Sequence, residues 1–161
     1  HPEIGYNFRL TDLQASLGLS QLEKFEEIKS KKIKIFERYC ELLENVKEIE
    51  ILTPEKKVTS YIPFRTILMT RDNKAKDLMD YMSNLGIESR TTFFPLHKQP
   101  CYQKLAQKQF FHHSQLEMEE ALRNSVNAYE RGVCLPSYPS LEDDKIQYVC
   151  KTIKSYYNMT R

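Results

Sequence analysis

The feature that most constrains the fold is a run of apolar residues at helical spacing, which begins after Thr11 and continues to Val46. Thr11 is a good helix N-cap, and Gln14 three residues later completes a capping box. Lysines and glutamates fill the positions between the apolar ones, as is typical of an amphipathic helix. We therefore expect one long helix ending near Glu44, or two helices with a kink near Ser30. Because such a helix cannot bury its apolar stripe alone, it must pack on a sheet, a second helix or another subunit.

Strand and helix signals alternate along the rest of the chain, after a break at Thr53-Pro54. The expected elements are a strand at 61–69, a helix at 74–85 capped by Asn73 and closed by a left-handed Gly86, a strand at 87–92, a helix at 117–129, a strand at 133–135 and a helix at 142–157. Residues 93–100 hold two prolines and are expected to be irregular. This order predicts a small α+β domain, a few-stranded sheet with helices packed on one side and a long N-terminal helix.

The composition excludes several classes of protein. The chain has 161 residues, with 24 Lys+Arg against 22 Asp+Glu, so no concentrated basic face points to a nucleic-acid partner. It has no apolar run long enough for a membrane span. It also lacks an initiator Met and a signal segment, which favours a portion of a longer, cytoplasmic polypeptide. Its four cysteines form no CxxC pair and are interpreted as free thiols rather than zinc ligands or disulfides: Cys40, Cys101, Cys134 and Cys150.

An amide and a guanidinium stand directly before the expected helix start, at Asn7 and Arg9. Arg offers a planar fork of donors that suits phosphate or carboxylate, and the helix start adds a favourable dipole. From the spacing alone, however, Asn7 is more often a turn residue and Arg9 a surface ion-pair partner.

Other candidates are weaker when taken from spacing alone. His97 lies in the proline-bounded loop and titrates near neutral pH, but a loop histidine bonded to backbone is the more common case. Arg90, at the end of the second predicted strand, is either an edge ion pair or an anion contact. His112-His113 is interpreted as a solvated doublet rather than a metal site, and the lysine-rich run 29–34 as the exposed face of a helix. No nucleophile–base pair is evident.

Four segments resemble, in order, the DegT/DnrJ/StrS family of sugar aminotransferases. They are GYNFRLTDLQASLGLSQLEK (5–24), GIESRTTFFPLHKQP (86–100), GVCLPSYPSL (132–141) and the closing helix 143–156. The family's members use pyridoxal 5'-phosphate (PLP) and have the fold of aspartate aminotransferase, type I. Phe8 and Thr91-Thr92 depart from the commoner family pattern. The substrate loop resembles that of perosamine-type synthases, which aminate a 4-keto sugar on GDP.

The resemblance implies a domain organisation in which this chain is only one part. Residues 1–27 match the end of the large PLP-binding domain and a dimer-contact segment, and residues 28–161 match the small C-terminal domain. The lysine that holds PLP covalently falls upstream of this chain, so the resemblance assigns no catalytic residue here. The chain by itself is therefore expected to be inactive.

The resemblance also assigns roles to particular residues. The family's counterpart of Asn7 reaches the PLP phosphate of the neighbouring subunit of a homodimer, and that of Arg9 lies close to the same shared site. Arg90, Phe94 and His97 become candidate contacts for the nucleotide sugar. The implied reaction moves an amino group, with glutamate as the expected donor, to a keto sugar for surface polysaccharide. Two alternatives stay open: a relative without transamination, such as a sugar dehydratase or a regulatory protein, and a truncated, inactive interaction domain.

Overall fold

Two helices, rather than one, form the N-terminal part of the fold. The computed structural model describes residues 2, 3, 5–7, 9–54, 61–105, 120 and 122–160. Helix α1 (Asp12–Leu22) begins with the expected capping box, and α2 (Phe25–Leu43) follows it. The break lies at Glu23 and Lys24, where Lys24 leaves helical geometry with φ −100° and ψ 9°. The expected kink near Ser30 is therefore wrong, because residue 30 lies within the regular part of α2.

A four-stranded antiparallel sheet forms the centre of the domain. Its strands, in spatial order, are β1 (Ile49–Ile51), β2 (Thr66–Thr70), β4 (Gly132–Leu135) and β3 (Arg90–Thr91). The last strand along the chain thus inserts between two earlier ones. Because β4 runs antiparallel to both neighbours, its carboxyl end lies beside the amino ends of β2 and β3.

The strand boundaries differ from those that the sequence predicts. Strand β2 begins five residues later than expected, because Pro63 has no N–H to donate to a ladder and the chain bends at residues 64–65. Strand β3 covers only the end of the expected 87–92, whereas β4 at 132–135 confirms the prediction. The sequence reading missed β1, which is three residues long.

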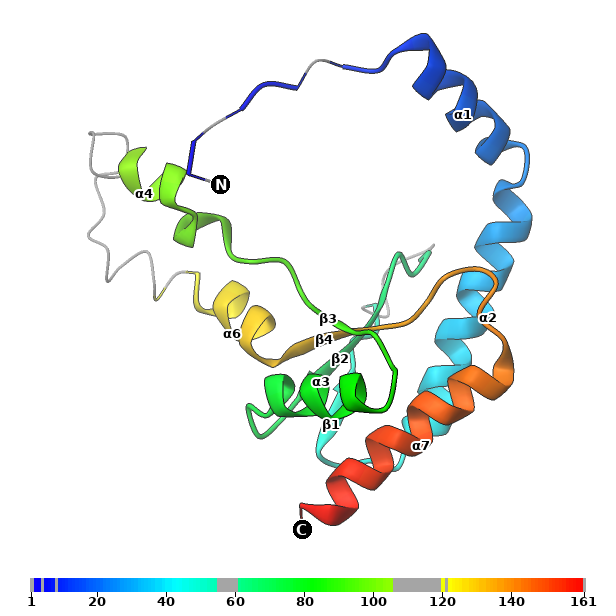
Figure 1. The fold of residues 1–161 in the computed structure, drawn as a ribbon, viewed down its shortest axis with the longest axis vertical. Coiled ribbons are helices and arrows are strands. Elements are labelled where there is room, and N and C mark those ends of the chain that lie inside the picture. The colour runs from blue at the N-terminus through cyan, green and yellow to red at the C-terminus, as the bar shows by residue number, and fades with distance from the viewer. Residues whose placement is uncertain are drawn as a thin grey trace.

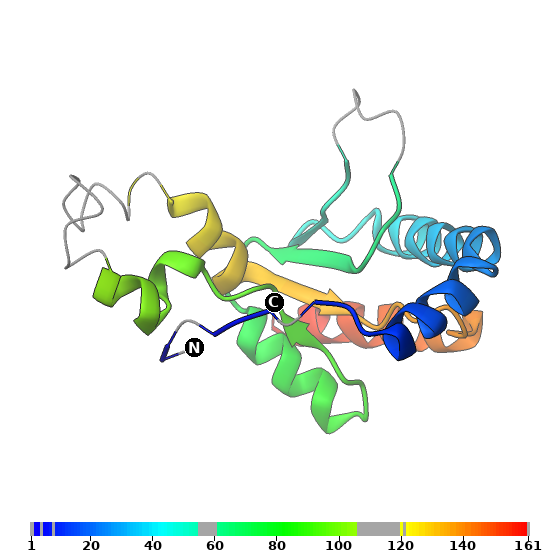
Figure 2. The same cartoon turned by 90° about the horizontal axis from the view of Figure 1, so that it is seen from above.

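Helices α2, α3 (Ala75–Asn84) and α7 (Asp143–Met159) cover one face of the sheet, as the sequence predicts (Figures 1 and 2). Leu68 and Val133 pair directly across β2 and β4 and point into this layer. Tyr39 of α2 and Ile153 of α7 are fully buried against them. The core therefore lies between the sheet and the three helices, which is the α+β arrangement expected.

The connections between the elements confirm one prediction and correct two others. Gly86 has φ +76° and closes α3 as predicted. The N-cap of α3 is Lys74 rather than Asn73, because Asn73 is in the left-handed region with φ +58°. Residues 93–100 are not wholly irregular: η1 (Leu96–Lys98) is a turn of 3₁₀ helix, and α4 (Pro100–Leu105) starts on a proline, which suits the first turn of a helix.

Helix α6 (Arg123–Arg131) leads directly into β4 and replaces the later part of the helix expected at 117–129. Residues 117–119 and the doublet His112-His113 lie outside the described residues. The entry into β4 is tight: a Cβ on Gly132 would overlap the Ala128 carbonyl oxygen and the methyl group of Thr92. Gly132 therefore allows α6 and the segment after β3 to meet.

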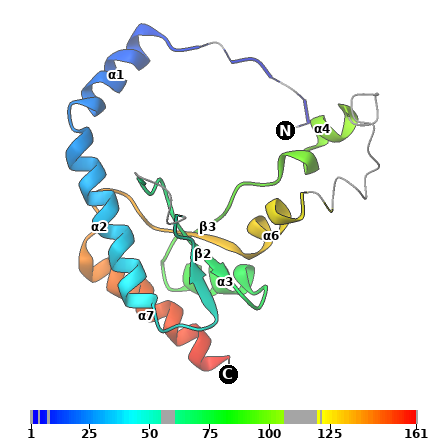
Figure 3. The same cartoon turned by 180° about the vertical axis from the view of Figure 1, so that it is seen from behind.

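Helix α1 stands apart from the packed layers, as Figures 1 and 3 show. None of its residues is buried, and its leucines are largely exposed: Leu13, Leu17, Leu19 and Leu22. Within the described part of the chain, no helix is long and apolar enough to cross a membrane.

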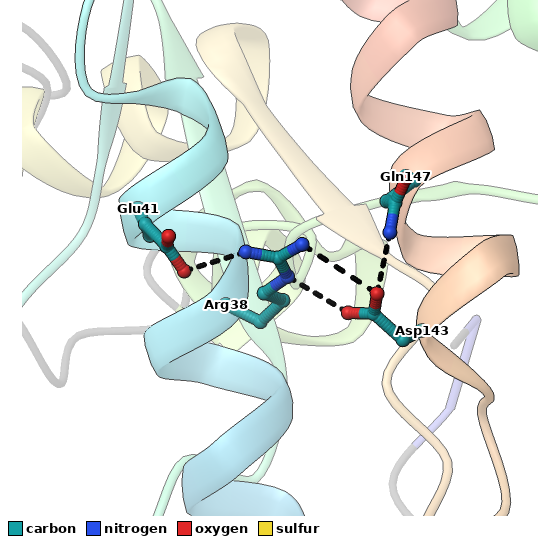
Figure 4. A network of polar contacts seen from close by, with 4 residues as sticks. All are labelled: Arg38, Glu41, Asp143 and Gln147. Atoms are coloured by element: carbon teal, nitrogen blue, oxygen red, sulfur yellow. Dashed lines mark hydrogen bonds and ion pairs between the residues drawn. The ribbon is translucent and has the colours of Figure 1, made fainter.

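An ion-pair network joins α2 to the start of α7 (Figure 4). The Arg38 Nε donates to Asp143 Oδ1 at 2.7 Å, and its Nη1 donates to Glu41 Oε2 at 2.7 Å. Gln147 donates to the other carboxylate oxygen of Asp143. These bonds hold the pKa of Asp143 below its ordinary value, the bond from Arg38 being the larger cause.

Candidate functional site

A groove of about 780 Å³ opens at the end of the sheet where β4 finishes and β2 and β3 begin. The antiparallel pairing brings these three strand ends together, and the first half of α7 and one residue of α2 complete the wall. The described lining residues are Lys32, Phe64, Arg65, Gly86, Ile87, Glu88, Ser89, Arg90, Cys134, Leu135, Pro136, Ser137, Tyr138, Leu141, Lys145, Tyr148 and Val149. Of the residues singled out from the sequence as substrate contacts, Arg90 lies in this groove.

Lys32 is the anchor of the groove wall. Its ammonium donates to the carbonyl oxygens of Phe64 at 2.7 Å and Ser137 at 2.6 Å, and so ties the segment before β2 to the segment after β4. Burial, and then the nearby Arg65 guanidinium, lower the pKa of Lys32. The interpretation of 29–34 as a wholly exposed face is therefore wrong at Lys32. It holds at Lys29 and Lys31, which pair with glutamates on the helix surface.

Two arginines face the same groove in different settings. Arg65 lies over the Phe64 and Phe93 rings, at 5.3 and 5.7 Å from their centroids. Arg90 begins β3 rather than ending the expected strand, and its Nη2 lies 2.8 Å from Glu88 Oε1. Both arginine arrangements leave donor hydrogens for a further acceptor, since a guanidinium carries five.

The segment before α1 presents Asn7 and Arg9 at the surface. The Asn7 Oδ1 accepts from the backbone N–H of Arg9 at 2.8 Å, and Arg9 has φ +67°. This local bond fixes the amide so that its Nδ2 hydrogens remain available as donors. The start of α1 contributes less to anion binding than expected. The capping box uses the N–H groups of Thr11 and Gln14, and Asp12 places a carboxylate in the first turn.

Phe94 and His97 belong to the segment between β3 and α4. The Phe94 ring packs edge-on against Tyr129 of α6, with 5.1 Å between centroids. His97 lies in η1, and its Nε2 is buried without a hydrogen-bond partner in the described part of the chain. The candidates therefore come from three places: the segment before α1, the groove, and the segment after β3.

Lys32 and Arg65 were not predicted from the sequence as residues of a functional site. Neither lies in a recognisable motif, and their lining role depends on segments far apart in the sequence meeting at one sheet end. The four cysteines are free thiols, and Cys101, Cys134 and Cys150 are buried. Among the described residues, no group of three His, Cys, Asp or Glu side chains could hold a metal ion.

A family model described as "DegT/DnrJ/EryC1/StrS aminotransferase family" matches residues 1–154. The chain belongs to this family. A GDP-perosamine synthase of Vibrio cholerae is 35% identical over an alignment of 163 positions, which covers 98% of this chain and 40% of that protein. A GDP-perosamine synthase of Escherichia coli O157:H7 is 30% identical over 98% of this chain and 39% of that protein. The chain thus spans about two fifths of the length of these family members.

Solved structures of sugar aminotransferases show the same fold. A putative sugar aminotransferase, Spr1654 from Streptococcus pneumoniae in its PMP form, superposes with a TM-score of 0.77 at 20% identity, over 95% of this chain and 36% of that one. PseC of Helicobacter pylori, an aminotransferase involved in the biosynthesis of pseudoaminic acid, gives a TM-score of 0.74 at 21% identity, over 98% and 40%. The expectation of an α+β portion of this aminotransferase fold is confirmed.

Proposed function

We propose that this chain is the C-terminal portion of a PLP-dependent aminotransferase that transfers an amino group, with glutamate as the expected donor, to a nucleotide-linked keto sugar. The observation that carries the proposal is the family match over residues 1–154. Two relatives at 35% and 30% identity are GDP-perosamine synthases, which favours a GDP-linked 4-keto sugar. The product would serve surface polysaccharide or amino-sugar biosynthesis in the cytoplasm.

The residues before α1 fit the phosphate group of PLP. Asn7 keeps its Nδ2 hydrogens available because its Oδ1 is already bonded to the Arg9 N–H. Arg9 adds a guanidinium, and charge-assisted hydrogen bonds to phosphate are stronger than neutral ones. We infer that both side chains donate to the PLP phosphate of a partner subunit. Bound PLP would supply the electron sink for amino transfer.

The segment between β3 and α4 is the proposed contact for the nucleotide sugar. Arg90 lines the groove, whereas Phe94 is held by Tyr129 and His97 by the turn of η1. The His97 Nε2 is buried and has no hydrogen-bond partner among the described residues, which supports a role because such atoms are rare. A sugar hydroxyl would satisfy it.

The exposed leucines of α1 support the proposed domain organisation. Residues 1–27 would belong to the large domain and the dimer contact, and residues 28–161 to the small domain. A helix that buries none of its residues in its own chain gains stability by packing elsewhere. A homodimer with shared active sites would provide that packing.

The proposal is tested with the full-length protein. It should purify with the visible absorbance of bound PLP, and this absorbance should disappear when the lysine upstream of residue 1 that holds PLP is replaced. It should also aminate a GDP-linked 4-keto sugar in the presence of glutamate. A folded, full-length protein without PLP absorbance would overturn the proposal.

The role of Asn7 gives a sharper prediction. Asn7→Ala removes one hydrogen bond to a charged group, so PLP affinity should fall by about tenfold or more, as a loss of about 1.5–3 kcal/mol implies. PLP retention after dialysis measures it. In mixed dimers that carry the change in one subunit, the defect should appear in the site of the other. Glu3→Ala, in the same exposed segment, is the control. Unchanged PLP retention in Asn7→Ala would count against the contact.

One comparison favours a second candidate, a regulatory relative. A "Pleiotropic regulatory protein" of Geobacillus stearothermophilus is 26% identical over 98% of this chain. The residue at the upstream position of the Schiff-base lysine distinguishes the alternatives: lysine there favours transamination, and histidine in its place favours a sugar dehydratase. Bound PLP without amino transfer to any keto sugar would favour the regulatory relative.

A further inference from the structure

We propose that Lys32 is a positioning residue for the nucleotide sugar, which acts by holding together two of the strand ends that form the groove. Lys32 does not contact the substrate in this role; it sets where the residues that do contact it stand. Because those contacts are the ones proposed for the sugar, the role rests on the proposed function. It adds a residue of α2, which no motif in the sequence marks, to the machinery of that reaction.

The ladder between β2 and β4 ends where the groove begins. Its last described pair is Thr66 opposite Leu135. When the same register is continued by two residues, Phe64 stands opposite Ser137. Pro136, between them and the last pair, has no N–H with which to extend the ladder. The two segments therefore need another partner to stay together in the groove wall.

Lys32 is that partner. Its ammonium donates to the carbonyl oxygen of Phe64 at 2.7 Å and to that of Ser137 at 2.6 Å, and so bonds both members of the opposed pair. Hydrogen bonds from an ionised donor are stronger than those from a neutral one. The side chain is half-buried, so water competes less for these bonds than at an exposed lysine. Because α2 packs into the core, the bridge ties both segments to a rigid element.

Tyr39 provides a second bond from the same face of α2. It lies seven residues after Lys32, close to two full helical turns, which places both side chains on one side of the helix. The Tyr39 hydroxyl donates to the Pro136 carbonyl at 2.9 Å. Helix α2 thus bonds to two successive carbonyls after β4, and Lys32 extends the attachment to the segment before β2. The groove wall is therefore placed by α2.

The position of Phe64 reaches the proposed sugar contacts through the next residue. The Arg65 guanidinium lies over the Phe93 ring, 5.7 Å from its centroid, and Phe93 directly precedes Phe94. A shift of Phe64 would therefore move the group against which Phe93 stacks. A displacement of about 1 Å by a change far from the chemistry can lower a rate by about a hundredfold. A bridge that never contacts the substrate can thus affect how the substrate is bound.

The test compares Lys32→Met with Lys32→Arg in the full-length protein. Methionine donates no hydrogen bond, whereas a guanidinium has donors for both carbonyls. In Lys32→Met, amide hydrogen exchange in peptides covering 61–66 and 136–141 should become about tenfold faster or more, because local opening becomes easier. Its kcat/KM for a GDP-linked 4-keto sugar should fall by about tenfold or more. Lys32→Arg should recover slow exchange and most of this kcat/KM.

Glutamate and two control variants separate positioning from stability. Because glutamate carries no nucleotide sugar, its kcat/KM and the PLP absorbance should change by less than about twofold in Lys32→Met. Lys34→Met alters an exposed lysine of the same helix and should change none of the readouts. Ile153→Val removes a methyl group from the core, outside the described lining of the groove. It should lower the melting temperature but leave kcat/KM for the keto sugar within about twofold of wild type.

Several results would overturn the proposal. Faster exchange in Lys32→Met without a loss in kcat/KM for the keto sugar would mean that the bridge serves stability alone. A loss in kcat/KM with unchanged exchange would mean that Lys32 contacts the substrate itself. An equal loss in Ile153→Val would mean that any destabilisation has this effect. A full-length protein that aminates no keto sugar contradicts the proposed function, and the exchange rates distinguish that failure from a failure of the bridge.

Discussion

Tyr39 shows how a single residue joins the core to the functional surface. Its ring is fully buried, and its hydroxyl donates to the Pro136 carbonyl at 2.9 Å, at the point where β4 ends and the groove wall begins. Burial of the hydroxyl raises the pKa of Tyr39, so the neutral donor persists at all ordinary pH values. Pro136, in the wall of the groove, is thus held in place by a hydrogen bond from the buried core.

Tyr39→Phe should therefore destabilise the protein. The change removes the hydrogen bond of a buried hydroxyl and leaves the half-buried Pro136 carbonyl without this donor, which costs about 1–3 kcal/mol in the free energy of unfolding. Urea denaturation measures it. Tyr148→Phe is the control, because the Tyr148 hydroxyl donates to the Leu85 carbonyl at 3.1 Å but is partly exposed, so that water replaces it. Its cost should stay below about 0.5 kcal/mol. Equal losses in the two variants would contradict the role of burial.

At the scale of elements, the pair Arg38–Asp143 fixes where α7 starts relative to α2. The folded state holds the pKa of Asp143 below its unfolded value of 3.8, chiefly through the bond from Arg38. A lowered carboxyl pKa contributes stability that is complete above the unfolded value and is lost as pH falls through the folded value. The contribution is therefore complete above about pH 4 and decreases as the pH falls below that value.

Asp143→Asn should lower the melting temperature at pH 7, and the difference from wild type should close as pH falls below about 4. Melting curves recorded from pH 7 down to pH 2.5 check this. Asp144→Asn removes the same charge from the next residue, which lies 3.7 Å from Lys145 in an exposed pair, and should show a smaller gap. A gap that stays constant over the pH range would mean that the carboxylate charge of Asp143 does not contribute.

The sequence predicts a feature well where a few adjacent residues determine it and poorly where tertiary context decides. The capping box at Thr11 and the left-handed Gly86 were found because each depends on a few adjacent residues. Strand β1 was missed because three residues are too few for an alternating pattern to be distinguished. The break at Lys24 has no proline or glycine to mark it, and apolar spacing continues on both sides. The groove was missed because its wall exists only once β4 has inserted between β2 and β3.

At the scale of the whole molecule, the exposed leucines of α1 lead to opposite predictions for the 161-residue chain alone and for the longer protein that we propose. Leu17→Asp should raise the solubility of the 161-residue chain, because the change removes apolar surface from water. In the full-length protein it should lower stability by about 1.5–3 kcal/mol, the value of burying a leucine. Light scattering and melting curves measure the two effects. Lys34→Asp, on the exposed face of α2, should leave both unchanged. If Leu17→Asp did not lower the stability of the full-length protein, α1 would have no packing partner there.

The position of β4 has a consequence for the way the protein is made. Strand β3 is at the edge of the sheet and, among the described strands, pairs with β4 alone, yet β4 leaves the ribosome after β1, β2 and β3. Strands β1 and β2 are able to pair early, whereas β3 waits through all of residues 92–131 for its partner. A nascent chain that stalls before residue 132 therefore carries an unjoined half-sheet and uncovered apolar side chains, which are the features that chaperones and proteases bind. The four-stranded sheet at the centre of the domain therefore forms only after residue 135 has been synthesised.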